Sequence, residues 1–312
     1  MRLFNFKEPL NFMRLKWPAI AFSSLLILAS IFSIATKGIN WGLDFTGGTV
    51  IEVGFKSQAD LTKVRHTLAE QGFPDAIVQY FGTSQDVMIR IAPRPDVKQV
   101  AIADQIMTAL KTVDSSVESR RIEFVGPSVG DELREDGAMA LLAALVVILI
   151  YVAARFEWRL SVGAVTSLGH DVILTLGLFS ALGLEFDLTV LAAVLALIGY
   201  SINDTIVVFD RIRESFRKLR DVDVDYTVND AITSTLSRTT MTSFTTALTL
   251  IVLFYMGGTM IHGFATALLF GIAVGTYSSI YVASAIAVLL GISREDMLPV
   301  VIEKEGENTP SL

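Results

Sequence analysis

The sequence of 312 residues contains no cysteine, and it has only three histidines. The absence of cysteine excludes a disulfide framework, a thiolate nucleophile and any cysteine-based metal site. Charged residues are also few, because Asp, Glu, Lys and Arg make up 18% of the chain, and the net charge is −7. A negative balance argues against nucleic-acid binding, which uses a basic face. Neither an internal repeat nor a low-complexity segment is present.

Apolar residues, in contrast, are abundant: they form 52% of the chain and give a mean hydropathy of +0.55. This composition is typical of a polytopic membrane protein. Six stretches are long enough to cross a bilayer as helices, near residues 18–35, 138–154, 160–182, 188–209, 241–256 and 264–290. Residues 33–35 resemble a signal-peptide cleavage site, but the apolar run is too long for a signal peptide and five further stretches follow. We therefore predict an uncleaved transmembrane helix over residues 18–36.

The distribution of Lys and Arg predicts the orientation in the membrane. Positive residues precede the first predicted span and follow the second and fourth: Arg2, Lys7, Arg14, Lys16, Arg155, Arg159, Arg211, Arg213, Arg217, Lys218 and Arg220. The loops at 183–187 and 257–263 contain none. We predict cytoplasmic ends at residues 1–17 and 292–312, and transmembrane helices 2–6 over residues 138–291. The C-terminal tail is acidic and is predicted to be disordered.

The long segment 38–137 then lies outside, in the periplasm, and its pattern predicts a folded domain. Apolar periodicity indicates four strands and two helices, in the order 49–55, 59–73 (helix), 76–82, 86–92, 97–113 (helix) and 117–125. A hairpin turn is expected at Thr83-Ser84-Gln85. The order strand, helix, strand, strand, helix, strand predicts a ferredoxin-like α+β domain. No cluster of histidine or cysteine suggests chemistry in it, so a binding or handle domain is favoured over a catalytic one.

Polar and small residues recur at helical spacing in the last four predicted spans. The third carries Gly163, Ser167, Asp171 and Thr175, with His170 alongside. The fourth carries Ala196, Tyr200 and Asp204, with Gly199 and Asn203 adjacent. The fifth, expected to begin near Asn229, carries Ser234, Arg238, Thr242, Thr245 and Thr249. The sixth carries Gly263, Ala267, Gly271, Gly275 and Ser279, a pattern of small residues that favours close helix contact.

Asp204 is the strongest candidate for function among these residues. An ionised side chain within a membrane costs at least a few kcal/mol, so such residues face a protein interior and serve a role. Structural alternatives stay open for the others. Arg238 is close enough to the predicted interface to extend to it, His170 and Asp171 can be hydrogen-bonded packing partners, and the Ser and Thr stripe can bond helices together.

Several stretches, in order along the chain, resemble one protein family. They are "WGLDFTGGTVIEV" (41–53), "RRIEFVGPSVGDEL" (120–133), "ARFEWRLSVGAV" (154–165), "LGHDVILTLG" (168–177), "IGYSINDTIVVFDRIRE" (198–214), "LSRTTMTS" (236–243) and "GTYSSIYVASA" (275–285). Together they are similar to the SecD/SecF family of bacterial protein-export membrane subunits, within the resistance-nodulation-division superfamily. The first two stretches carry the family-motif residues Asp44, Gly47, Gly48, Gly126, Pro127 and Gly130.

The resemblance implies an accessory subunit of the Sec translocase. Because a protomer of the superfamily has twelve spans, six spans imply a partner, SecD, that supplies the other half. The pair would use the proton-motive force to promote late preprotein translocation through the SecYEG channel, after SecA has started it. YajC and YidC are further implied partners, next to the translocating preprotein. The implied location is the bacterial inner membrane, and neither an enzymatic activity, a metal nor a cofactor is implied.

The resemblance also implies roles for individual residues. Asp204 and Arg238 correspond to the proton relay of the family, and His170, Asp171 and Asn203 are candidates to assist or support it. Three other functions remain open at this point. They are a half-transporter for lipids or drugs, an intramembrane aspartyl protease using Asp171 and Asp204, and a passive membrane scaffold.

Overall fold

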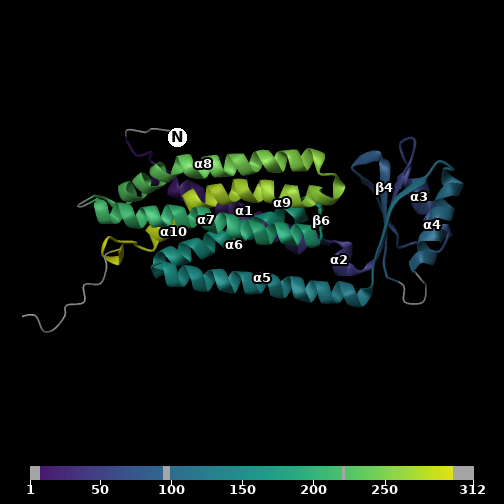
Figure 1. The fold of residues 1–312 in the computed structure, drawn as a ribbon, viewed down its shortest axis with the longest axis horizontal. Coiled ribbons are helices and arrows are strands. Elements are labelled where there is room, and N and C mark those ends of the chain that lie inside the picture. The colour runs from purple at the N-terminus through teal and green to yellow at the C-terminus, as the bar shows by residue number, and fades with distance from the viewer. Residues whose placement is uncertain (1–7, 94–98, 220–221, 298–312) are drawn as a thin grey trace, which may run out of the picture.

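The computed structural model describes residues 8–93, 99–219 and 222–297. Figure 1 shows a long helical bundle with a small α/β domain at one end. We call the end of the bundle next to this domain the near end, and the opposite end the far end. Most of the predicted C-terminal tail lies outside the described residues, as do the first seven positions of the N-terminus.

Six helices in the described part of the chain are long and apolar enough to cross a membrane. They are α1 (Lys16–Lys37), α5 (Pro127–Arg155), α6 (Trp158–Leu182), α7 (Leu188–Lys218), α8 (Val224–Met256), and α9 (Thr259–Tyr277) with its continuation. The fold predicted from hydropathy, six membrane helices with a mixed domain between the first and second, is confirmed.

The α/β domain has the predicted strand–helix order. Its elements are β2 (Gly48–Gly54), α3 (Leu61–Glu70), β3 (Ile77–Phe81), β4 (Thr83–Ile91), α4 (Gln99–Val113) and β5 (Glu118–Val125). The four strands form an antiparallel sheet in the order β3-β4-β2-β5. This is the ferredoxin-like arrangement, in which both helices pack on the sheet. Apolar residues at alternate positions of the strands form the core of the domain together with apolar residues of the two helices.

The hairpin between β3 and β4 turns at a different place from the prediction. Thr83 already pairs with Phe81, so the turn is at Gly82 and not at Thr83-Ser84-Gln85. Gly82 has φ +77°, a left-handed conformation that glycine adopts without steric cost. The residues predicted as the turn therefore extend β4.

Four membrane helices differ clearly from the predicted apolar runs, and α7 does so by continuing to Lys218, past the predicted end at residue 209. α5 begins at Pro127, not Ala138, because proline suits the first position of a helix and the polar residues that follow remain helical. α8 begins at Val224 and not near Asn229. The Asp223 side chain caps this earlier start by accepting a hydrogen bond from the backbone N–H of Asp225. The sixth span is interrupted: α9 passes into a π-helix (Ser278–Ala283) and then α10 (Ser284–Leu289).

The small-residue seam of the sixth span packs against α7, as its sequence predicts. A Cβ added at Gly271 would lie 2.5 Å from the Leu197 side chain, and one at Gly263 would lie 2.9 Å from Val190. The absence of these side chains lets α9 approach α7 closely along its length. α7, the helix that carries Asp204, therefore lies at the centre of the bundle, between α6, α8 and α9.

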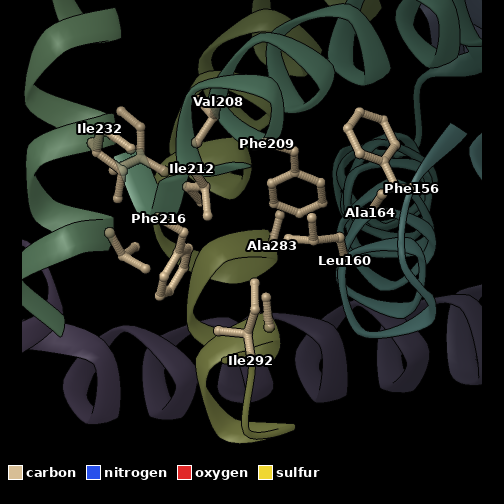
Figure 2. Close-up of a cluster of buried hydrophobic side chains, with 14 of the residues drawn as sticks. Phe156, Leu160, Ala164, Val208, Phe209, Ile212, Phe216, Ile232, Ala283 and Ile292 are labelled. Atoms are coloured by element: carbon tan, nitrogen blue, oxygen red, sulfur yellow. The ribbon is translucent and has the colours of Figure 1, made fainter. Parts of the chain in front are cut away.

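An apolar cluster holds the far end of the bundle together. Figure 2 shows Phe209 of α7 gathered with Leu160 and Ala164 of α6 and with Ala283 of the π-helix. Phe209 is fully buried and packs edge-on against Phe156, with ring centroids 5.8 Å apart. Rings and branched side chains from four helices fix how α6, α7 and the π-helix are placed around the polar residues between them.

Candidate functional site

Asp204 lies inside the bundle, on the part of α7 that faces its neighbours. The residue is 5% exposed, and its Oδ2 atom is buried without a hydrogen-bond partner among the described residues. A buried polar atom left without a partner costs about 1–3 kcal/mol, and more when it is charged. Asp204 is therefore placed where its ionised form lacks full compensation within this chain.

Arg238 lies near Asp204 but does not bond to it. Its charge acts on the Asp204 carboxyl through space, yet no ion pair within 4 Å and no side-chain hydrogen bond of Arg238 is found in the described ranges. Arg238 is exposed on α8, and Thr245 and Thr249 of the same stripe are exposed with it. This part of the stripe thus faces away from the other described helices.

The threonines of this stripe satisfy their hydroxyls within α8. Thr245 donates to the Met241 carbonyl at 2.9 Å, and Thr249 donates to the Thr245 carbonyl at 3.3 Å. Hydrogen bonds of this kind, to the preceding turn, do not join helices. Ser234 of the same stripe, in contrast, accepts a hydrogen bond from Arg211 Nε of α7 at 2.7 Å, so the alternative that the stripe bonds helices together holds for Ser234 but not for these threonines. Asn203 is exposed as well, and so lies off the buried face that holds Asp204.

His170 and Asp171 belong to a separate, fully buried polar cluster on α6. Their residues are 2% and 0% exposed, and His170 Nδ1 lies 2.9 Å from Asp171 Oδ1. The other carboxylate oxygen, Oδ2, accepts hydrogen bonds from the Ser201 hydroxyl of α7 at 2.5 Å and the Ser278 hydroxyl of the π-helix at 2.8 Å. Three stretches that carry the family resemblance thus meet at one carboxylate.

Sequence analysis did not single out Ser201 and Ser278. Both stand next to residues with a stronger signal, Ser201 before Asn203 and Asp204, and Ser278 at the end of the small-residue seam. A fully polar pair such as Ser278-Ser279 within an apolar span is a signal in itself, since each hydroxyl needs a partner in the membrane. The predicted small and polar stripe of α6 faces this cluster: Ser167 donates to Ser278 at 3.0 Å.

The family-motif residues lie together at the near end, where the α/β domain joins the bundle. α2 (Leu43–Thr46) and β1 (Asn40–Trp41) follow α1, and β1 forms a parallel bridge with β6 (Glu185–Phe186), just before α7. We call α2, β1, β6 and the first turn of α5 the joint. Within it, Asp44 Oδ2 accepts a hydrogen bond from the backbone N–H of Leu188 at 3.0 Å. Asp44 thus caps the helix that carries Asp204.

Glycines let the joint close. Gly48 has φ +119°, and a Cβ there would lie 2.3 Å from the Ile91 carbonyl oxygen. Gly47 has φ +65° and packs against Pro127 at the start of α5, while a Cβ on Gly130 would lie 2.9 Å from the Gly47 nitrogen. Gly126 precedes α5 as its N-cap residue and meets no such close contact. The chain connects the bundle to the α/β domain twice, once at Gly47 and Gly48 and once at the start of α5. These two connections are in direct backbone contact.

An ion pair that the sequence did not indicate joins the α/β domain to the bundle. Arg90 of β4 pairs with Glu185 of β6 and also donates to the Trp41 carbonyl at 2.8 Å. Burial raises the pKa of the Glu185 carboxyl more than the neighbouring Arg90 lowers it. In the described ranges, no group of three or more His, Cys, Asp or Glu is placed to hold a metal ion.

Comparison with known proteins gives the family. Residues 105–293 match the family described as "Protein export membrane protein SecD/SecF, C-terminal". Residues 32–59, which include Asp44, Gly47 and Gly48, match the "SecD/SecF GG Motif". The chain belongs to the SecD/SecF family. It is thus a multi-pass membrane protein of a family of protein-export components.

Relatives of known name match over nearly the whole chain. The protein translocase subunit SecF of Vibrio alginolyticus is 57% identical over 301 residues, which cover 96% of each chain. The protein translocase subunit SecF of Escherichia coli O157:H7 is 46% identical over 304 residues, which cover 97% of this chain and 94% of that one. Both names describe transport components and not enzymes.

Solved structures of the family are larger. SecDF from Thermus, described as a translocon-associated membrane protein, matches with a TM-score of 0.83 and 38% identity over 92% of this chain. This chain spans 39% of the length of that SecDF chain. A SecDF structure described as the super-membrane-facing form matches with a TM-score of 0.69. The arrangement of this chain therefore resembles the former structure more than the latter.

Proposed function

We propose that this chain is the six-helix half of a proton-driven export motor, which pairs with SecD and promotes late preprotein translocation through the SecYEG channel. The motor resides in the bacterial inner membrane, with both termini in the cytoplasm and the α/β domain in the periplasm. The distribution of Lys and Arg supports this orientation. SecA starts translocation from the cytoplasm, and no cofactor is required because the proton gradient supplies the energy.

The observation that carries the proposal is the surroundings of Asp204. Among the described residues, this carboxylate has a buried oxygen without a hydrogen-bond partner, and the cation that acts on it, Arg238, is exposed on a polar face of α8. Contact with lipid is energetically unfavourable for a guanidinium group and for a row of threonine hydroxyls. A second six-helix half packed against this face explains both the exposed cation and the match to a SecDF chain more than twice as long.

The energetics suit a switch between two states. An ionised Asp204 favours a close Arg238, whereas a protonated one needs no cation, so binding a proton changes which packing of α7 and α8 is preferred. One charge moved across the full membrane potential is worth about 2.3 kcal/mol per 100 mV. This energy biases a two-state element but is too small to pull a long chain in one step. A ratchet on the emerging preprotein is therefore favoured over a power stroke.

Replacing Asp204 tests the proposal directly. Asp204→Asn keeps the size and hydrogen-bonding capacity of the side chain but cannot ionise, so it mimics the protonated state. We expect the variant to assemble with its partner in normal amount and to lose gradient-dependent export, while the early ATP-driven phase persists. Arg238→Leu should have the same effect, and the double variant should be no worse than either single one. The measurement is late-stage translocation in vesicles, with and without an imposed proton gradient.

Two other outcomes would contradict the proposal in different ways. Equal losses of assembly and export in Asp204→Asn would make the residue a structural contact and favour the passive scaffold. Full gradient-dependent export in Asp204→Asn would place the proton path elsewhere in the complex. Asp204→Glu is the matched control, because it keeps an ionisable carboxyl group at the same position of α7. It should retain gradient-dependent export.

A further inference from the structure

The buried cluster around Asp171 is not needed for the Asp204 mechanism, yet it holds two groups that can bind a proton. Its members come from elements far apart in the sequence: His170 and Asp171 from α6, Ser201 from α7 and Ser278 from the π-helix. His170 and Asp171 side chains are 1% and 0% exposed. Both are therefore shielded from water and lipid within this chain.

The charge of the cluster is not balanced by a fixed cation. No Lys or Arg bonds to Asp171 in the part of the chain that the structure describes. Other titratable or charged groups lie on the helices that pack against α6. They include Tyr200 and Asp204 of α7, Tyr277 at the end of α9, Tyr281 of the π-helix, and Tyr151 and Arg155 near the far end of α5. Between its terminal lysines α1 has none. An ionised Asp171 beside a neutral His170 thus leaves one uncompensated negative charge, and a bound proton removes it.

The position that accepts this proton can be identified. His170 Nδ1 is held by Asp171 Oδ1 at 2.9 Å, whereas Nε2 is buried with no hydrogen-bond partner among the described residues. A carboxylate on one ring nitrogen fixes the tautomer, with Nδ1 as the donor and Nε2 as the open acceptor. The Tyr277 ring lies alongside, with its centroid 6.2 Å from that of His170. Its hydroxyl is 2.9 Å from the Ala19 carbonyl oxygen of α1, so it is directed elsewhere.

The same carboxylate touches the irregular part of the last span. Ser278, which donates to Asp171, is the first residue of the π-helix. A Cβ on Gly163, two turns away on α6, would lie 2.6 Å from the Ala283 carbonyl oxygen at the end of the π-helix. π-Helical turns are rare, and they occur mostly at functional positions. The hydrogen bond from Ser278 to Asp171 therefore holds the start of the π-helix against α6.

We propose that His170 and Asp171 form a second proton-binding site, distinct from Asp204, which takes a proton at His170 Nε2 and releases it. A change in the charge of the pair alters how strongly Asp171 holds the hydroxyls of Ser201 and Ser278, and so couples the proton to the packing of α7 and the π-helix on α6. The site itself requires nothing beyond the contacts described, while its use in export rests on the proposed function.

The chain has only three histidines, which makes a direct test practical. His66 is exposed on α3 and His262 is exposed near the start of α9. In a His66→Gln, His262→Gln background, nitrogen-15 NMR of the reconstituted protein reports on His170 alone. We expect its signals to change from the neutral, Nδ1-protonated ring to the doubly protonated ring between pH 9 and pH 5. Asp171→Asn should shift the midpoint of this transition by at least a tenfold change in proton concentration. A ring that stays in one state over the whole range would overturn the proposal.

Export measurements separate this site from the proposed function. His170→Gln keeps a donor near Asp171 but cannot titrate, so we expect at least a fivefold smaller dependence of gradient-driven export on pH, with normal assembly. The His66→Gln, His262→Gln background should behave as the parent protein. If His170 titrates while Asp204→Asn exports fully, the second site stands and the proposed role of Asp204 fails. If Asp204→Asn blocks export while His170→Gln exports with an unchanged pH profile, the second site is wrong and the proposed function stands.

Discussion

Two aspartates on neighbouring membrane helices are both buried, but their surroundings are opposite. Asp171 has a hydrogen-bond partner on each oxygen, whereas Asp204 has a buried oxygen with none in the described ranges. A carboxylate with a full set of donors is stable in one arrangement, and one that lacks donors gains by changing its partner or its protonation. At the scale of single residues, the contrast separates a carboxylate that organises helices, with its proton taken up at the neighbouring His170, from a carboxylate that itself responds to a proton.

Gly48 lies directly after the joint, at a position where the structure leaves no space for a Cβ atom. We expect Gly48→Ala to lower the melting temperature of the protein in detergent, because the methyl group would meet the Ile91 carbonyl oxygen at 2.3 Å and φ is +119°. Backbone strain alone costs about 1–3 kcal/mol, and the steric conflict adds to it. Gly72→Ala is the matched control, since Gly72 also has a positive φ but open space around its Cβ position. Equal effects of the two substitutions would contradict the role of the close contact.

The Arg90–Glu185 pair should show a pH-dependent stability of defined sign. Burial raises the pKa of Glu185 above its ordinary value of 4.5, so the folded state favours the protonated form, and this contribution is lost as the pH rises through the folded-state pKa. Arg90→Ala removes the cation that opposes this effect. We expect a cost of about 1–2 kcal/mol at pH 8, because a half-buried carboxylate is left unpaired.

Lowering the pH to 5 should reduce this difference between Arg90→Ala and the parent protein, as Glu185 becomes protonated. Glu185→Gln, which removes the carboxylate, should remove the pH dependence of the Arg90→Ala effect. The measurement is thermal unfolding of the parent protein, the two single variants and the double variant at several pH values. A deficit of Arg90→Ala that grows on acidification would show that Glu185 is not the group involved.

At the scale of elements, α7 connects the two functional regions of the bundle. Its first turn is capped from within by Asp187, which accepts from the Val190 N–H at 2.8 Å, and from the joint by Asp44. Farther along the helix, Ser201 contacts Asp171 and Asp204 lies one turn beyond. The start of α7 is therefore tied to the joint through Asp44, and the same helix carries Ser201 and Asp204.

Removing the cap from the joint should loosen the start of α7. We expect Asp44→Ala to cost about 1 kcal/mol, as the loss of a capping side chain usually does. Hydrogen exchange should increase at the Leu188 amide and its neighbours, while the interior of α7 stays protected. Asp60→Ala, which removes the cap of α3 from the Thr62 and Lys63 amides, is the control and should act only within the α/β domain. Unchanged exchange at Leu188 in Asp44→Ala would refute the capping role.

The sequence determined most elements because their signals are local. Uninterrupted apolar runs indicate membrane helices, and alternation with turn residues indicates the strands of the α/β domain. Two features escaped prediction for a common physical reason. The helix α2 and the π-helix at Ser278 make contacts with distant residues, such as those of Asp44 with Leu188, of Ser278 with Asp171 and of Gly163 with Ala283. Such contacts leave no periodic pattern in the chain itself.

The candidate site shows the same division. Asp204, Arg238, His170 and Asp171 stand out in the sequence because charged residues are expensive in a membrane. Which of them contact one another does not follow from their spacing, since it depends on the rotation of each helix about its axis. The structure separates Asp204 from Asp171 and leaves Arg238 on the outer face of α8. The prediction of an Asp204–Arg238 relay stays a prediction.

At the scale of the whole molecule, the outer faces of the bundle differ in polarity. Large apolar residues are exposed along α1 and α5, including Val147 of α5 at 65%, and such a surface suits lipid. The exposed face of α8 combines apolar residues with Arg238, Thr245 and Thr249. Because polar groups in a membrane face protein or water, this face is where the second half should pack.

The cysteine-free chain allows that expectation to be tested by labelling. We expect a Thr245→Cys variant, in native membranes that contain the partner, to react with a lipid-soluble maleimide at least fivefold more slowly than a Val147→Cys variant. Both positions lie in membrane helices and are exposed in the isolated chain, so only a neighbouring protein can protect one of them selectively. Without the partner, the two rates should become similar. Equal labelling in its presence would mean that the polar face of α8 contacts lipid or water, and the second half would then have to pack on another side of the bundle.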